Sequence, residues 1–393
     1  MQPTSSRPPR LPYIDVLRGF VIVLMALDHA RDMFHDSGYA YDPLDASHTS
    51  IAVYLTRLAT HLCAPTFVLL AGVSSWLQRG RGKSTRDLSA FLLQRGVWMI
   101  VLEATIVSFG WDFSMPYLIL FQVIWGIGVA MIVLSGLVWL PQPLVCGIGV
   151  AIVAGHNLLD HVPVAAGSRL GVFWSIVHVG GQWPAGKSPV LIMTYPVLAW
   201  TGVIALGYGL GPVFVSAWRR RFFLIAGPVL LMSFVLLRWH NDYGDPNPWV
   251  AGPSLKVTLM HFFFVQKYPP SLMYLCLTLG FTFLLAALFD SWQARITQFF
   301  REFGRVPLFA YVLHLYLLHA ADVMALFVTG RSVAASLGQN RKSFFAPEQL
   351  AGSGFPLPVV YAVWLGIVLL LYPLCRYWSD MKARNRSWWM SYL

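Results

Sequence analysis

Long apolar runs dominate this sequence and constrain its fold more than any other feature. A bilayer core of about 30 Å needs about 20 consecutive apolar residues to be spanned by a helix. Only 11% of the 393 residues are charged, whereas soluble domains carry about 25%. We therefore predict an all-α polytopic membrane protein, a bundle of about ten transmembrane helices. The expected spans are Tyr13–Ala30, Leu55–Leu77, Ala90–Phe109, Tyr117–Leu140, Leu144–Leu159, Val190–Phe214, Phe222–Leu237, Ser271–Phe289, Val306–Val328 and Leu357–Tyr377.

Two weaker apolar stretches, Gly171–Gly180 and Leu255–Val265, are too short to cross a bilayer and are expected to be re-entrant or interfacial. The expected organisation is a cytoplasmic tail over residues 1–12, a transmembrane domain over 13–378 and a second cytoplasmic tail over 379–393. The four cysteines lie in or beside apolar runs without CxxC spacing. The sequence thus predicts neither a disulfide framework nor a metal site.

The formal net charge of +11 is unevenly distributed along the chain. With ten spans, most of the 28 Lys and Arg fall on the side that carries both termini. Because cytoplasmic loops are enriched in Lys and Arg, this pattern predicts a multi-pass protein of the inner cell membrane with both termini cytoplasmic. Such positive charge favours anionic membrane lipid as a partner and argues against nucleic acid.

The first expected span interrupts its apolar run with the stretch "LMALDHARD". A helical rotation of about 100° per residue places Asp15, Arg18, Met25 and His29 on one stripe. His29 lies about 16 Å beyond Arg18 at a rise of 1.5 Å per residue. The stripe therefore predicts a basic group near the cytoplasmic surface and an imidazole in the outer part of the membrane.

Other expected helices bring ionisable side chains to a similar depth. Each such group is costly inside a membrane, so several at one level indicate a polar cavity that opens outward. The candidates besides Asp28 and His29 are Arg57, His61, Glu103, Asp112, His314, His319 and Asp322.

The cytoplasmic side differs in its chemistry. Arg18, Arg95 and Arg305 lie at the inner ends of three expected helices, and the loop "RGRGKSTR" is nearby. Guanidinium groups bind phosphate oxygens in bidentate geometry. This side is therefore a candidate site for a ligand that carries phosphate.

Five stretches of the sequence, in order, resemble bacterial members of the heparan-alpha-glucosaminide N-acetyltransferase family. They are "LPYIDVLRGFVIVLMALDHARDMF", "LTRLATHLCAPTFVLLAGVSSWL", "YPVLAWTGVIALGYGLG", "KYPPSLMYLCLTLG" and "FGRVPLFAYVLHLYLLH". The resemblance implies a transmembrane acyltransferase that takes acetyl from cytosolic acetyl-CoA. It would pass the acetyl group to an amine or hydroxyl of an extracytoplasmic acceptor, a sugar amine in the lysosomal relatives.

The resemblance also implies a catalytic histidine near the extracytoplasmic side. We predict His29 as the base, with His61 as second choice and Asp28 as its orienting or charge-stabilising partner. In the animal relatives the catalytic histidine lies in the loop after the first helix, where this sequence offers His35 and His48. For acetyl-CoA binding the predicted residues are Arg18, Arg95, Arg305 and His314.

Two other functions are compatible with these residues. In a proton-coupled transporter or flippase of a polar solute or lipid-linked sugar, the His and Asp side chains would relay protons. In a haem-binding electron carrier, histidines would serve as axial ligands. The sequence leaves open the acceptor, the length of the acyl chain, an acetyl-histidine intermediate and the formation of a homodimer.

Overall fold

The structure is a computed structural model that describes residues 11–80, 82–165, 168–183, 190–292, 294–385, 387 and 390. Most of the predicted N-terminal tail, residues 1–10, and several residues of the C-terminal tail lie outside the described residues. The last helix continues to Arg384, past the expected boundary at residue 378. The domain boundaries stay a prediction.

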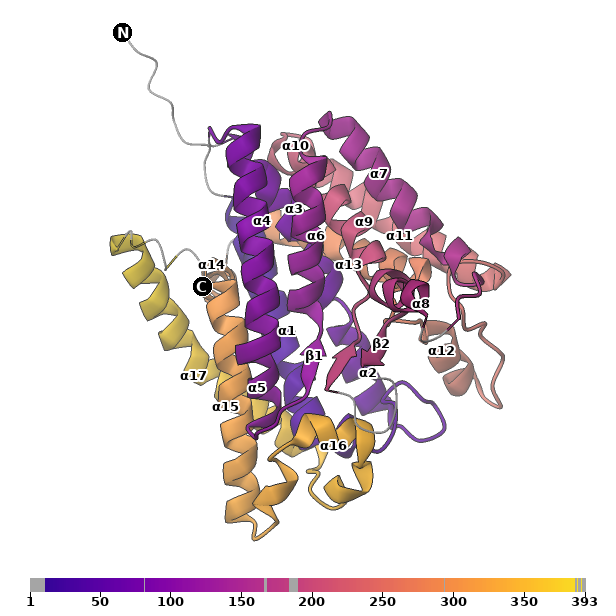
Figure 1. The fold of residues 1–393 in the computed structure, drawn as a ribbon, viewed down its shortest axis with the longest axis vertical. Helices are drawn as coiled ribbons and strands as arrows, with labels where there is room; N and C mark the ends of the chain where they lie inside the picture. The colour runs from indigo at the N-terminus through magenta and orange to yellow at the C-terminus, as the bar shows by residue number, and fades with distance from the viewer. Residues whose placement is uncertain are drawn as a thin grey trace.

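The described residues are mostly helical (Figure 1). The first half contains α1 (Pro12–Phe34), η1 (Asp36–Gly38), α2 (Ile51–Thr60), α3 (Cys63–Gly80), α4 (Thr85–Leu102), η2 (Glu103–Val107), α5 (Ser108–Asp112), β1 (Ile119–Phe121), α6 (Val123–Leu137), α7 (Gln142–Gly155), η3 (His156–Leu159), α8 (Arg169–Trp174), η4 (Ser175–Val179), β2 (Gly181–Trp183) and β3 (Leu191–Met193). The second half contains α9 (Val197–Gly209), α10 (Gly211–Val215), α11 (Arg219–His240), α12 (Leu255–Phe263), α13 (Leu272–Ser291), α14 (Arg295–Arg305), α15 (Pro307–Val328), η5 (Val333–Ala335), α16 (Gln339–Phe345), η6 (Pro347–Leu350) and α17 (Leu357–Arg384).

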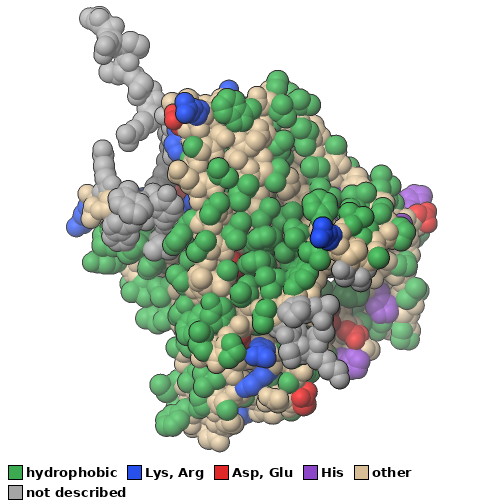
Figure 2. All heavy atoms as spheres, viewed as in Figure 1, with side chains coloured by type: hydrophobic (Ala, Val, Ile, Leu, Met, Phe, Trp, Pro, Cys, Tyr) green, Lys and Arg blue, Asp and Glu red, His purple; other side chains and the backbone are tan. Residues whose placement is uncertain are grey.

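Seven of the described helical segments are long and apolar enough to cross a membrane: Ile51–Gly80, Thr85–Asp112, Gln142–Leu159, Arg219–His240, Leu272–Ser291, Pro307–Val328 and Leu357–Arg384. The other three expected spans correspond to α1, which carries several charges, and to the shorter helices α6 and α9. An all-α polytopic membrane protein is thereby confirmed. Figure 2 shows hydrophobic side chains over much of the face in view, as contact with lipid requires.

Helix α1 lies at the centre of the bundle, and most of its residues are buried. It packs against α3, α13, α14, α15 and α17. In contrast, only 22% of the apolar window of each of the helical segments Gln142–Leu159, Arg219–His240 and Leu357–Arg384 is buried. The charges of "LMALDHARD" are therefore surrounded by protein, where neighbouring side chains can satisfy them.

We call the end of the bundle at which α1 and α4 begin the N-side, and the end at which α1 stops the far side. Glycines let α14 approach α1 closely near the N-side. A Cβ on Gly19 would lie 1.7 Å from the carbonyl oxygen of Phe300, and one on Gly304 would lie 1.7 Å from that of Asp15. Only glycine permits this backbone contact, a common device of membrane helix pairs.

Two expected spans begin too early in the sequence-based prediction. Instead of starting near Tyr117 and Val190, the helices α6 and α9 start at Val123 and Val197. The preceding apolar residues form a three-stranded sheet of order β1-β3-β2, in which β1 is parallel to β3 and Ile119 faces Leu191. Apolar strands and helix segments look alike to hydropathy, so this small sheet was not predicted.

Candidate active site between two cavities

Two histidines from distant parts of the chain meet in the centre of the bundle. Nδ1 of His29 on α1 lies 2.8 Å from Nε2 of His314 on α15. Their rings stack with centroids 5.0 Å apart. His314 is fully buried and His29 is nearly so.

The hydrogen bonds of this pair determine its tautomers. Nδ1 of His314 lies 3.0 Å from the carbonyl oxygen of Ala310. Because a carbonyl only accepts, this nitrogen carries the proton, and Nε2 of neutral His314 accepts from Nδ1 of His29. No hydrogen bond to Nε2 of His29 is found among the described residues. Its lone pair is thus available to a reacting group.

A cavity of about 280 Å³ approaches the pair from the N-side. We call it the N-side cavity. Its mouth carries Arg18 and Arg95, and its inner part ends at Met25 and Tyr311. Between them the walls are mainly apolar, with Phe67, Met99, Ile127, Met131 and Leu308 among the lining residues. Met25 is one turn before His29, and Tyr311 is one turn before His314.

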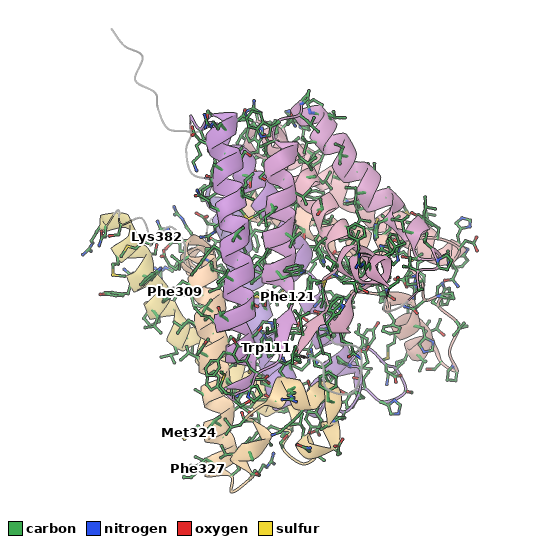
Figure 3. All side chains as sticks on the ribbon, viewed as in Figure 1. Trp111, Phe121, Phe309, Met324, Phe327 and Lys382 are labelled. Atoms are coloured by element: carbon green, nitrogen blue, oxygen red, sulfur yellow. The ribbon has the colours of Figure 1, made fainter. Side chains whose placement is uncertain are left out.

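An adjoining vestibule of about 620 Å³ shares Arg18 with the N-side cavity. It adds Lys83 and Lys382 to the cationic side chains. Lys382 lies on α17, near the N-side (Figure 3). The guanidinium of Arg18 hydrogen-bonds Ser74 and lies 3.4 Å from the carboxylate of Asp15. The path from solvent to the histidines therefore begins basic and becomes apolar.

A second cavity, of about 190 Å³, lies on the far side. We call it the far-side cavity. Its lining combines aromatic, amide and hydroxyl side chains with one carboxylate, that of Asp32. The amide nitrogen of Asn340 is buried there, and none of the described residues is its hydrogen-bond partner. Other lining residues are Tyr39, Trp111, Gln122, Thr194, Tyr268, Gln339, Ser343 and Phe344.

The two cavities approach each other at the histidine pair. Gln122 lines the far-side cavity, whereas the next residue, Val123, lines the N-side cavity. The His29 ring contacts one aromatic residue from each: its centroid is 6.2 Å from that of Tyr311 and 4.8 Å from that of Trp111. Figure 3 shows Trp111 at the level of α5. The His29 ring is therefore in contact with the lining of both cavities.

Asp28 takes part in a buried charge cluster instead of binding His29. Its carboxylate receives hydrogen bonds from Arg57 at 2.7 and 2.8 Å, from Arg31 at 2.9 Å and from Thr60 at 2.8 Å. The ammonium of Lys267 lies 3.8 Å away. The structure therefore places His314, not Asp28, against the ring nitrogen of His29, and it gives Asp28 three cationic neighbours.

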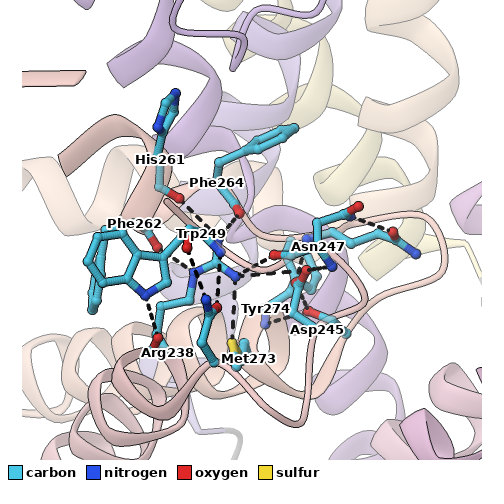
Figure 4. A network of polar contacts seen from close by, with 12 residues as sticks. Arg238, Asp245, Asn247, Trp249, His261, Phe262, Phe264, Met273 and Tyr274 are labelled. Atoms are coloured by element: carbon cyan, nitrogen blue, oxygen red, sulfur yellow. Dashed lines mark hydrogen bonds and ion pairs between the residues drawn. The ribbon is translucent and has the colours of Figure 1, made fainter. Parts of the chain in front are cut away.

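A second buried network holds the segment that carries Lys267 (Figure 4). The guanidinium of Arg238 on α11 is almost fully buried and lies 3.9 Å from Asp245. The other oxygen of Asp245 accepts from the backbone of Gln266 and from the hydroxyl of Ser271. Four carbonyls also accept from Arg238, those of Asn247, His261, Phe262 and Phe264. This network positions residues 264–271 beside the Asp28 cluster.

Several residues predicted for the site lie elsewhere. His61 is buried with its ring against Tyr274, and its ring nitrogens have no hydrogen-bond partner within the described part of the chain. Arg305 pairs with Glu302 at 3.2 Å and is absent from the residues that line the two cavities. His48 is 67% exposed in a loop beside Asp45, and His35 caps a short turn.

Sequence reasoning did not single out Lys382, Trp111, Tyr311 or Asn340, which line the cavities or the vestibule, and it included Lys83 only as part of the loop "RGRGKSTR". Lysines near helix ends and aromatic residues in spans are common in membrane proteins, so composition gave no signal for them. The spacing of Tyr311 one turn before His314 was the only local hint.

The fold and this site define a polytopic membrane protein with a buried imidazole pair between two cavities of different polarity. Residues 10–238 match the family model described as heparan-alpha-glucosaminide N-acetyltransferase, catalytic. This match covers more than half of the chain, which therefore belongs to that family. Membership indicates acyltransferase activity in a general sense. No curated protein matches the chain.

Proposed function

We propose that this protein transfers an acetyl group from cytosolic acetyl-CoA, through the bundle, to an amine or hydroxyl of an extracytoplasmic sugar or glycan. The protein would lie in the inner cell membrane, with its N-side facing the cytoplasm. The observation that carries this proposal is the position of Nε2 of His29, which has an available lone pair where the two cavities approach each other.

The N-side offers chemistry that suits coenzyme A. Its phosphates would bind the cationic side chains of Arg18, Arg95, Lys83 and Lys382, since charge-assisted hydrogen bonds to phosphate are among the strongest in proteins. The pantetheine arm would extend along the apolar walls towards Met25 and Tyr311. That arrangement brings the thioester within one helical turn of His29.

The far-side cavity suits a polar acceptor. Its amides and hydroxyls can hydrogen-bond a sugar, and its aromatic rings offer apolar faces for stacking. His29 Nε2 would remove the proton of the attacking amine or hydroxyl and later return it to the departing thiolate. His314 would keep His29 in the required tautomer by accepting from its Nδ1.

The proposal is tested with purified protein in liposomes. Acetyl-CoA labelled in the acetyl group is supplied on the face exposing the N-side, and glucosamine on the opposite face. We expect labelled N-acetylglucosamine on the glucosamine side and free coenzyme A on the other, both in amounts that depend on the two substrates. Uptake of glucosamine without acetylation would support the transporter instead. If the thioester were consumed and the acetyl group transferred to an acceptor on the same face, transfer across the membrane would be contradicted.

The cationic mouth gives a separate prediction. Arg18→Met or Lys83→Met should raise the KM for acetyl-CoA about tenfold or more, because each lost charge-assisted hydrogen bond is worth about 1.5–3 kcal/mol. Steady-state kinetics over a range of acetyl-CoA concentrations measure this effect. The matched control is Arg220→Met, an exposed arginine at the start of α11 on the same side. Equal KM values for all the variants would show that coenzyme A does not bind at this mouth.

A further inference from the structure

Two hydrogen-bond donors beside the His29 ring have no partner among the residues that the structure describes. The hydroxyl of Tyr311 and Nε1 of Trp111 are both buried, and neither has an acceptor within hydrogen-bond reach in this part of the chain. Tyr311 is 3% exposed and Trp111 is 7% exposed. Most buried polar groups in native proteins are hydrogen-bonded, so two exceptions at one place need an explanation.

The positions of these donors relate them to the site. Tyr311 lines the N-side cavity, and its ring centroid lies 6.2 Å from that of His29 and 5.6 Å from that of His314. Trp111 lines the far-side cavity and contacts the same His29 ring at 4.8 Å between centroids. The two hydrogen-bond donors thus come from α15 and α5. Tyr311 contacts the imidazole from the N-side cavity, and Trp111 contacts it from the far-side cavity.

A local structural explanation is available for Tyr311 alone. One carboxylate oxygen of Glu103, Oε1, is also buried with no partner from the described residues, while Oε2 accepts from the backbone of Trp125 at 2.8 Å. A small rearrangement that paired Tyr311 with Glu103 would make the hydroxyl a structural group. That explanation does not extend to Trp111. It also predicts that removing the Tyr311 hydroxyl lowers the stability of the protein, whereas a hydroxyl without a partner can be removed without such a loss.

We propose that Tyr311 Oη–H and Trp111 Nε1–H form the oxyanion hole of the transfer reaction, donating hydrogen bonds to the thioester oxygen as it becomes negative. This inference rests on the proposed acetyl transfer. Donors fixed in a site that excludes water stabilise such charge without reorganising during the reaction. They would have no partner until the thioester is bound, as the structure shows for both groups.

With an amine acceptor the transfer consists of an addition and a collapse. The amine nitrogen forms a bond to the carbonyl carbon, the π electrons of the carbonyl move to its oxygen, and the amine proton goes to Nε2 of His29. The oxyanion is held by Tyr311 and Trp111. When it collapses, the C–S bond breaks and the coenzyme A thiolate takes the proton from His29. The same oxyanion forms if Nε2 of His29 attacks first, so both routes need these donors.

The test compares Tyr311→Phe and Trp111→Phe with the unaltered protein in the full liposome assay. Loss of one oxyanion donor lowers kcat about 100-fold to 1000-fold in acyl transfer. We expect a fall of that order for Tyr311→Phe, with the KM for acetyl-CoA changed less than threefold, an order-of-magnitude bound for a contact made mainly in the transition state. Because the substitution removes a hydroxyl without a partner, the Tm should stay the same or rise.

Tyr13→Phe is the matched control. The Tyr13 hydroxyl donates to the carbonyl of Phe214 at 2.7 Å, so its removal leaves a buried acceptor unpaired. We expect a lower Tm and an unchanged kcat for this variant, the reverse of the Tyr311→Phe result. Trp111→Phe should lower kcat with little change in KM, which provides an independent reading from the other donor.

The outcomes separate this inference from the proposed function. If the unaltered protein shows no turnover of acetyl-CoA, both fail. Should it turn over while Tyr311→Phe retains full kcat, only the oxyanion hole is overturned. A fall in both Tm and kcat for Tyr311→Phe would assign the hydroxyl to a structural pair with Glu103 and would equally overturn the proposal.

Discussion

His29→Gln is expected to lower the kcat for acetyl transfer about 100-fold to 10,000-fold, the range that a positioned general base contributes. Glutamine can still hydrogen-bond Nε2 of His314, but it cannot remove a proton from the acceptor. In the unaltered protein the His29 ring contacts Tyr311, which lines the N-side cavity, and Trp111, which lines the far-side cavity, and the lone pair of its Nε2 is available. Release of coenzyme A and formation of acetylated acceptor, measured together, check this expectation.

Two further histidine variants make that result specific. His314→Gln should cause a smaller loss than His29→Gln, because His314 acts on the tautomer of His29 and does not contact the reacting atoms in the proposed mechanism. His319→Gln is the matched control on the same helix: His319 contacts the carbonyl of Gly110 and stacks on Phe113. Full activity in His29→Gln, or equal losses in all three variants, would refute the role of His29.

Asp28→Asn is expected to destabilise the folded protein by about 3–5 kcal/mol, the cost of removing one partner from a buried ion pair. The variant leaves Arg31, Arg57 and Lys267 around a neutral side chain in the centre of the bundle. Repulsion among the three cations then lacks its compensating charge. Unfolding of the detergent-solubilised protein by denaturant, monitored by helix content, measures the change in free energy.

A double variant shows whether charge is the cause. Arg57→Met combined with Asp28→Asn removes one of the stranded cations, so the double variant should be less destabilised than the sum of the two single variants. Asp45→Asn is the matched control, since Asp45 pairs with His48 in an exposed loop and surface pairs are worth only about 0–1 kcal/mol. Additive losses in the double variant would mean that Asp28 acts through its shape and hydrogen bonds alone.

The prediction of helices succeeded where the structure depends on residues that are close together in the sequence. The low charge content and the long apolar runs indicated a polytopic all-α membrane protein, and each expected span contains a helix in the structure. The prediction was wrong about the starts of α6 and α9, because the apolar residues before Val123 and Val197 pair with one another across the small sheet. Strand pairing joins residues far apart in sequence, and hydropathy does not detect it.

The sequence by itself determined the membrane class, the central stripe from Arg18 to His29 and the basic character of the N-side, since periodicity and charge follow from the order of residues within one helix. Only the tertiary structure decided that His314 contacts His29 and that Asp28 instead holds three cations. It also decided that two cavities approach each other at the pair. Periodicity gives the depth and face of a side chain, whereas the choice of neighbouring helix depends on packing among all of them.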